Sequence, residues 1–113
     1  MQMSQTLQSV YSVYGDDPNL AELVEIFVSE LPRRVETLQS HAEVEDWESF
    51  ARVAHQINGN ASSYGFPQLS TLAARIEYAC RGSNSTKAIL QSLDNFIEYC
   101  EQIRAGVPGK RIA

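Results

Sequence analysis

The side chain best suited to nucleophilic chemistry in this sequence is the imidazole of His55. It lies within residues 54–65, which read AHQINGNASSYG. Asn58-Gly59 is a strong turn signal, yet the flanking residues follow a helical pattern. The second histidine, His41, lies near the expected end of a helix, where an imidazole suits the helix dipole, and we interpret it as a surface residue. Because the two histidines share no metal-ligand spacing, the sequence predicts no metal site.

A helix through residues 50–64 would place His55 on the side that faces away from the apolar stripe. At about 100° per residue, one side of this helix collects the apolar residues Phe50, Val53, Ala54, Ile57, Ala61 and Tyr64. His55 lies about 150° from the centre of that stripe, so we expect it to face solvent. Its expected neighbours on the exposed face are Ala51, Arg52, Asn58, Gly59 and Ser62.

Gly59 is the residue that decides how accessible the imidazole is. Helical side chains tilt towards the helix N-terminus, so a side chain at position 59 would cover His55. Glycine inside a helix costs about 1 kcal/mol relative to alanine, and we expect this face to pack on nothing within the protein. We therefore infer that the glycine leaves the imidazole open to a bulky group or to another protein. Two other interpretations stay open: an ordinary exposed histidine, and a glycine that marks a close helix crossing.

The elements that must position this histidine are predicted to be helices. Apolar residues recur at steps of three and four along most of the chain, and strand signals are nearly absent. We expect helices at residues 18–30 and 32–43, kinked or broken at Pro32. The next helix would be capped by Asp46 and terminated by Gly65 in the left-handed conformation, and Pro67 would open another helix that ends at Gly82. A last helix would lie between the Ser83-Asn84-Ser85 loop and Gly106. An additional short helix is predicted from the apolar residues Leu7, Val10, Tyr11 and Tyr14, ending at Gly15.

The predicted fold class is all-α, because helices of similar length joined by short loops pack antiparallel to their neighbours. We expect an antiparallel up-and-down four-helix bundle with a short additional N-terminal helix. It would form a single domain over residues 1–113, with a core bundle at about 16–105 and a flexible tail at 106–113.

Composition excludes several classes of partner. The chain has 113 residues and a formal net charge of -5. This charge argues against nucleic acid and against anionic membrane surfaces, because both require clustered lysine and arginine. No apolar run has membrane-spanning length, and the first residues lack the features of a secretory signal, so we expect a cytoplasmic protein. Cys80 and Cys100 form no CxxC pair and are expected to be reduced core residues. We expect a monomer.

The sequence around His55 resembles a known signature. Ala54-His55-x-Ile57-x-Gly59-x-Ala61-x-x-x-Gly65-x-x-x-Leu69 is similar to AH-x-L-K-G-x-A-x-x-x-G-x-x-x-L, the pattern of histidine-containing phosphotransfer (HPt) domains. The stretch DPNLAELVEIFVSELPRRVETL, the Asp46-Trp47 pair and the LAARIE run at residues 72–77 also match. The resemblance covers about residues 16–104 and implies a four-helix bundle with the histidine on its second helix.

The resemblance implies that His55 accepts a phosphoryl group from a receiver-domain aspartate and passes it to another receiver. The implied partners are response-regulator receiver domains and a hybrid sensor histidine kinase, and the receiver would bring the Mg²⁺. No cofactor is expected on this chain, and no Gly-rich phosphate loop or P-loop lysine indicates an ATP site, so the chain would be a phosphoryl carrier and not an enzyme. We expect the phosphate environment to include Asn58, Gly59 and Ser62, and the docking surface to include Ala51, Arg52, Gln56 and Ser63.

One departure from the pattern bears on activity. The family usually has lysine three residues after the histidine, and this chain has Asn58. Asparagine offers a neutral N–H donor where lysine would partly neutralise the phosphoryl group. Arg52 should lean towards the helix N-terminus, away from His55, and is not a replacement. This departure leaves open a bundle that docks receivers or other proteins without accepting phosphate. Separately, the chain could be the phosphotransfer domain of a larger kinase.

Overall fold

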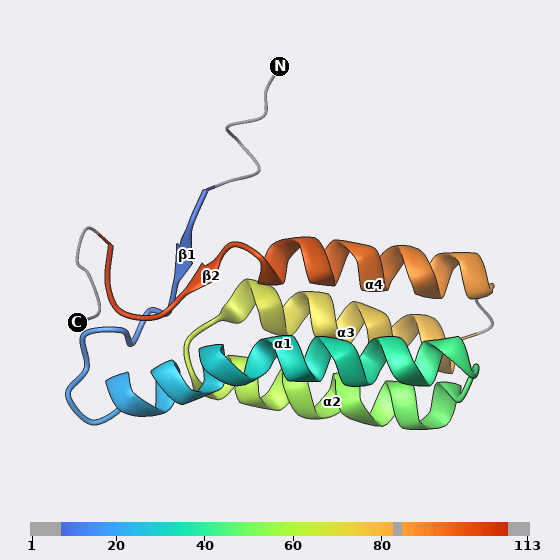
Figure 1. Ribbon diagram of the computed structural model, residues 1–113, viewed down its shortest axis with the longest axis horizontal. Helices are drawn as coiled ribbons and strands as arrows, with labels where there is room; N and C mark the ends of the chain where they lie inside the picture. The colour runs from blue at the N-terminus through green and yellow to red at the C-terminus, as the bar shows by residue number, and fades with distance from the viewer. Residues whose placement is uncertain (1–7, 83–84, 109–113) are drawn as a thin grey trace, which may run out of the picture.

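Four helices make up most of the computed structural model, which describes residues 8–82 and 85–108. They are α1 (Ala21–Glu43), α2 (Trp47–Ser63), α3 (Pro67–Arg81) and α4 (Thr86–Cys100). Figure 1 shows the four helices side by side, each running antiparallel to the one before it. The predicted all-α, up-and-down four-helix bundle is confirmed.

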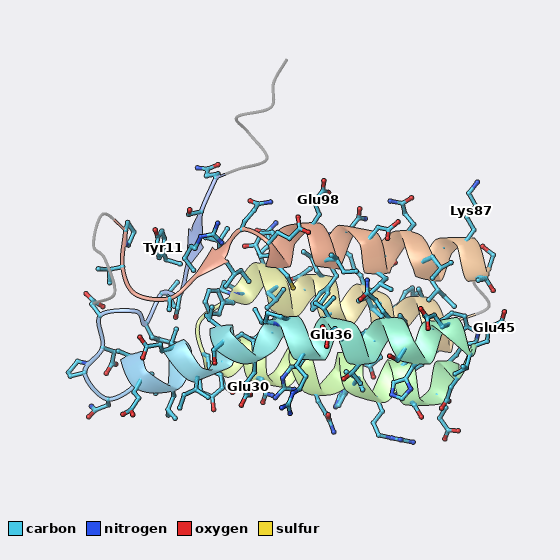
Figure 2. The ribbon with its side chains drawn as sticks, viewed as in Figure 1. Tyr11, Glu30, Glu36, Glu45, Lys87 and Glu98 are labelled. Carbon is cyan, nitrogen blue, oxygen red and sulfur yellow. The ribbon has the colours of Figure 1, made fainter. Side chains whose placement is uncertain are left out.

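Each helix buries one apolar stripe in a shared core. The largest fully buried side chains include Phe50, Phe66 and Phe96, one each from α2, the α2–α3 turn and α4. Phe27 of α1 contacts Phe66, with ring centroids 5.8 Å apart. Charged side chains project outwards from the helices, as Glu30, Glu36 and Glu98 do in Figure 2. The pattern of three- and four-residue steps in the sequence is therefore the pattern of burial.

The ends of α2 are determined by local sequence. Asp46 caps its first turn, and the carboxylate oxygen Oδ1 accepts a hydrogen bond from the Ser49 backbone N–H at 3.2 Å. Hydrogen bonds from the Ser49 side chain and backbone hold the pKa of Asp46 below its usual value. Beyond α2, Gly65 has a φ of 86°, the left-handed conformation that favours glycine. The chain then reverses, and Pro67 opens α3.

The expected division of the first long helix at Pro32 is wrong. α1 is a single helix of 23 residues with Pro32 inside it, and it starts at Ala21, not at residue 18. Proline removes one backbone hydrogen bond, at a cost of about 3 kcal/mol. The neighbouring residues offset this cost because Phe27, Leu31 and Leu38 are all buried in the core. Tertiary packing therefore overrides the local penalty.

The expected N-terminal helix is also wrong. Val10 and Tyr11 form a short strand, β1 (Val10–Tyr11), which pairs in parallel with β2 (Ile103–Arg104). Leu7, where the expected helix began, lies outside the described residues. The last helix is shorter than expected. It ends at Cys100 instead of running on towards Gly106, because Ile103 belongs to β2. Residues 106–108 of the expected flexible tail form no helix or strand, and residues 109–113 lie outside the described part of the chain.

This N-terminal segment is tied to the turn between α2 and α3. The Ser12 hydroxyl donates a hydrogen bond to the Tyr64 carbonyl oxygen at 2.6 Å, and the Val13 backbone N–H donates to the Gly65 carbonyl oxygen at 3.0 Å. Figure 1 shows β1 and β2 at the end of the bundle where this turn lies. The segment therefore braces the turn that determines how α3 returns along α2.

The two glycines of the α2 region should respond in opposite ways to substitution by alanine. At Gly65 a Cβ atom would lie 2.8 Å from Tyr14 Cδ2 and 3.0 Å from Val13 Cγ2, on a backbone that disfavours other residues. We expect Gly65→Ala to lower the free energy of unfolding by about 1–3 kcal/mol. At Gly59 a Cβ atom would meet nothing within 4 Å. We expect Gly59→Ala to raise stability by up to about 1 kcal/mol. Urea denaturation measures the free energy of unfolding of both variants, and equal changes in the two would contradict this expectation.

Candidate functional site

His55 projects outwards from the middle of α2. Its side chain is 68% exposed, whereas its neighbours Ala54 and Ile57 are fully buried. This arrangement confirms the expectation from the helical wheel that the imidazole faces solvent. The ring is accessible to a partner, although α2 itself is firmly packed.

A carboxylate on α3 holds one edge of the imidazole. Nδ1 of His55 lies 3.0 Å from Oε1 of Glu77, whose side chain is only 19% exposed. A carboxylate can only accept a hydrogen bond, so in the neutral ring it favours the tautomer with the proton on Nδ1. Nε2 then carries the free lone pair, and it has no hydrogen-bond partner among the described residues. The contact therefore leaves Nε2 as the nucleophilic atom.

Glu77 has a second partner. Its other carboxylate oxygen, Oε2, accepts a hydrogen bond at 3.0 Å from Nε of Arg81, one turn further along α3. The carboxylate is thus bound on both oxygens, by the imidazole on one side and by a guanidinium on the other. Two bonds limit its rotation, and so they limit the rotation of the ring.

Asn58 contacts α3 as well. The Ser70 hydroxyl donates a hydrogen bond to Oδ1 of Asn58, so the amide oxygen faces α3. The amide NH₂ group has no hydrogen-bond partner among the described residues. It is therefore available as a donor one turn beyond His55.

The small and polar residues expected around His55 are largely exposed. Gln56, Gly59, Ser62 and Ser63 are exposed, and no atom fills the space above Gly59. Arg52 is also exposed, and it pairs with Glu48 at 3.7 Å, towards the N-terminus of α2. This pairing confirms that Arg52 leans away from His55.

Two expectations for this face are wrong. Ala51, predicted as a docking residue, is 3% exposed and belongs to the buried side of α2, so it cannot contact a partner directly. The face was also expected to pack on nothing, but His55 and Asn58 both contact α3. The helical wheel defines the direction of each side chain but does not give the position of the neighbouring helix, and α3 lies closer to His55 than the wheel implies.

Sequence reasoning missed Glu77, Ser70 and Arg81 as site residues. A signal for Glu77 was available: His55 precedes Phe66 by 11 residues and Glu77 follows it by 11. In an antiparallel helix pair, residues equally distant from the turn lie at the same level. The family resemblance included Glu77 as the last residue of LAARIE but assigned it no role.

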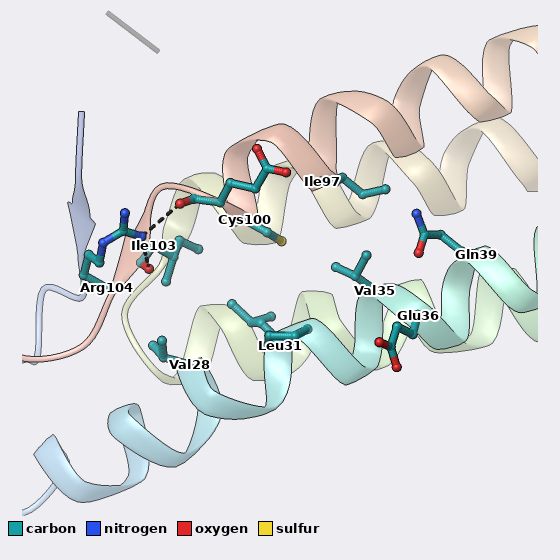
Figure 3. A pocket seen from close by; sticks show the side chains of 11 residues that line it. Val28, Leu31, Val35, Glu36, Gln39, Ile97, Cys100, Ile103 and Arg104 are labelled. Carbon is teal, nitrogen blue, oxygen red and sulfur yellow. Dashed lines mark hydrogen bonds between the residues drawn. The ribbon is translucent and has the colours of Figure 1, made fainter. Parts of the chain in front are cut away.

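The cysteines do not take part in this site. Burial raises the pKa of the Cys100 thiol to about 12 and also raises the pKa of Cys80, so both thiols stay protonated near neutral pH. Cys100 lines a cavity of about 580 Å³ between α1 and α4, together with apolar residues that include Val28, Leu31 and Ile97. Figure 3 shows this cavity on the α1–α4 side, and none of the residues expected around His55 lines it.

The described residues contain no cluster of three or more histidine, cysteine or acidic side chains that could hold a metal ion. Likewise, no helix in the described part of the chain has the length and apolar character needed to cross a membrane.

The described residues thus form a four-helix bundle that presents an accessible histidine bound by a carboxylate. A comparison with family models matches residues 22–106 to the Hpt domain, which is well over half of the chain. The chain belongs to the Hpt domain family. No curated protein and no solved structure matches it. The family implies involvement in phosphorelay and interaction with receiver domains and kinases. Hpt domains are phosphotransfer carriers and not ATP-using enzymes.

Removing the Glu77 carboxylate should change the tautomer of His55. In Glu77→Ala we expect a substantial population with the proton on Nε2, which has no lone pair left for attack. The ring would also rotate more freely, and we expect any transfer to His55 to slow by about three- to tenfold. Nuclear magnetic resonance of ¹⁵N-labelled histidine reports which ring nitrogen carries the proton. Unchanged ring nitrogen shifts in Glu77→Ala would contradict the role of the carboxylate.

Proposed function

We propose that this protein is a histidine phosphotransfer protein that carries a phosphoryl group on Nε2 of His55. The group would come from an aspartyl phosphate on one receiver domain and pass to the aspartate of another. The observation that carries this proposal is the exposed imidazole whose Nδ1 is held by Glu77 at 3.0 Å. In the neutral ring, that contact favours the proton on Nδ1 and so leaves the Nε2 lone pair free for in-line attack on phosphorus.

The transfer step follows from this geometry. The Nε2 lone pair forms a bond to phosphorus while the bond from phosphorus to the aspartate oxygen breaks, and the aspartate leaves as a carboxylate. Nδ1 keeps its proton, which stays hydrogen-bonded to Glu77. The reverse sequence passes the group to the second receiver. Because the imidazole needs no general base, the chain supplies an oriented nucleophile, and the receiver supplies the aspartate and the bound Mg²⁺.

The phosphoryl group would meet small and neutral groups on this chain. The Asn58 amide NH₂ is an available donor, Gly59 leaves open space, and the exposed Ser62 hydroxyl lies two turns beyond His55. A neutral donor stabilises a phosphoryl dianion less than a lysine would. We infer that much of the charge neutralisation comes from the receiver. Its docking surface would include the exposed residues Arg52, Gln56 and Ser63.

A second function is favoured by Asn58, which stands where the family usually has lysine. With Asn58 in place of lysine, the bundle could dock receiver domains without accepting a phosphoryl group. The two functions differ in whether His55 carries label, and not in whether receivers bind.

Labelling decides between them. We expect the protein, mixed with a phosphorylated receiver and Mg²⁺, to take up acid-labile, base-stable label, and we expect His55→Gln to abolish it. His41→Gln is the matched control. His41 lies in the last turn of α1 and not on α2, so this variant should leave labelling unchanged. Receiver binding without label in the unaltered protein would favour the docking function. Label on the His55→Gln protein would refute the proposed site.

A side chain at position 59 should hinder transfer without unfolding the helix. We expect Gly59→Leu to retain the fold, because the space there is open, and to slow transfer by about tenfold or more, because the side chain would lean over the imidazole. Gly59→Ala is the control for helix propensity and should affect transfer much less. The rate of label transfer from receiver to His55 measures both. Equal rates in Gly59→Leu and the unaltered protein would rule out an access role for the glycine.

A further inference from the structure

Arg81 is the cation linked most directly to the imidazole of His55. Its Nε lies 3.0 Å from Oε2 of Glu77, and Oε1 of the same carboxylate lies 3.0 Å from Nδ1 of His55. Arg81 does not reach the ring itself in any contact of the described structure. It therefore acts on the ring only through Glu77.

A carboxylate that contacts a neutral imidazole selects one of its two tautomers. Oε1 of Glu77 favours the form with the proton on Nδ1, which frees the lone pair of Nε2. This selection depends on where Oε1 lies. A cation bound to Oε2 limits the rotation of the carboxylate and so keeps Oε1 against Nδ1.

We propose that Arg81 is a positioning residue for the reaction of His55, an inference that rests on the proposed function. By binding Oε2, the guanidinium fixes Oε1 against Nδ1. More of the neutral ring then has its proton on Nδ1 and an oriented lone pair on Nε2, as in-line attack on phosphorus requires.

The charged groups on α2 do not replace Arg81. Arg52 and Glu48 lie one and two turns before His55, but they pair with each other at 3.7 Å, so their charges largely offset. Asn58 is neutral. The two described α3 residues that form an ion-pair chain with His55 are Glu77 and Arg81.

A matched control exists on α1. Arg34 pairs with Glu30 at 3.6 Å with the same four-residue spacing as Arg81 and Glu77, but Glu30 has no contact with a histidine. Surface pairs of this kind contribute little to stability. Arg34→Gln therefore tests what the loss of an equivalent ion pair does to the fold alone.

The first experiment needs no phosphoryl donor. Nuclear magnetic resonance of the ¹⁵N-labelled ring gives, for neutral His55, the ratio of the tautomer with the proton on Nε2 to the tautomer with the proton on Nδ1. We expect Arg81→Gln to raise this ratio by about two- to fivefold, because the Glu77 carboxylate can then rotate away from Nδ1. Arg81→Lys keeps the charge and should return the ratio to within about twofold of the unaltered protein. Arg34→Gln should leave it unchanged. An unchanged ratio in Arg81→Gln, or an equal change in Arg34→Gln, would overturn the proposal.

The second experiment measures transfer from a phosphorylated receiver. We expect Arg81→Gln to be slower by about two- to fivefold, in proportion to the fraction of the ring with the proton on Nε2. Arg34→Gln should transfer at the unaltered rate. An equal loss in Arg34→Gln would indicate a general structural effect and overturn the proposal. If the unaltered protein takes up no label, the proposed function fails, whereas the ring measurement still decides what Arg81 does to His55.

Discussion

The close antiparallel packing of α2 on α3 is the constraint on which the site depends. Several of the buried residues of these two helices are small: Ala51, Ala54 and Ala61 on α2, and Ala73 on α3. Small side chains let two helices approach closely, so a glutamate on one helix reaches a histidine on the other. Gly65 makes the reversal possible, and the N-terminal segment braces it through Ser12. Residues far from the imidazole therefore determine where the Glu77 carboxylate lies.

This packing resolves a conflict between exposure and order. A histidine that reacts with another protein must be accessible, but a freely rotating side chain loses entropy when it adopts one reactive geometry. Here the ring of His55 is mostly exposed, and its Nδ1 is held by the carboxylate of Glu77, whose side chain is mostly buried. Order comes from Glu77 and access comes from Gly59, so neither requirement is met at the expense of the other.

The sequence alone predicted the parts of this arrangement that depend on a single helix. The direction of His55, the buried positions Ala54 and Ile57, the Asp46 cap and the left-handed Gly65 all follow from local rules. The errors involve relations between segments. Pro32 stays within α1 because its neighbours are buried, and β1 forms because β2 is there to pair with it. Ala51 is buried by packing that the wheel of a single helix does not contain. Glu77 needed the same information, namely which residues of α3 face α2.

The replacement of lysine by Asn58 is best understood together with the pair formed by Glu77 and Arg81. Those two side chains offset each other, and Asn58 is neutral, so the immediate surroundings of the imidazole carry almost no net charge. A phosphoryl dianion on Nε2 would gain little stabilisation from its own chain, and its free energy would lie closer to that of an aspartyl phosphate. A carrier needs this property, because a group held too tightly cannot be passed on. The neutral asparagine is therefore compatible with transfer in both directions.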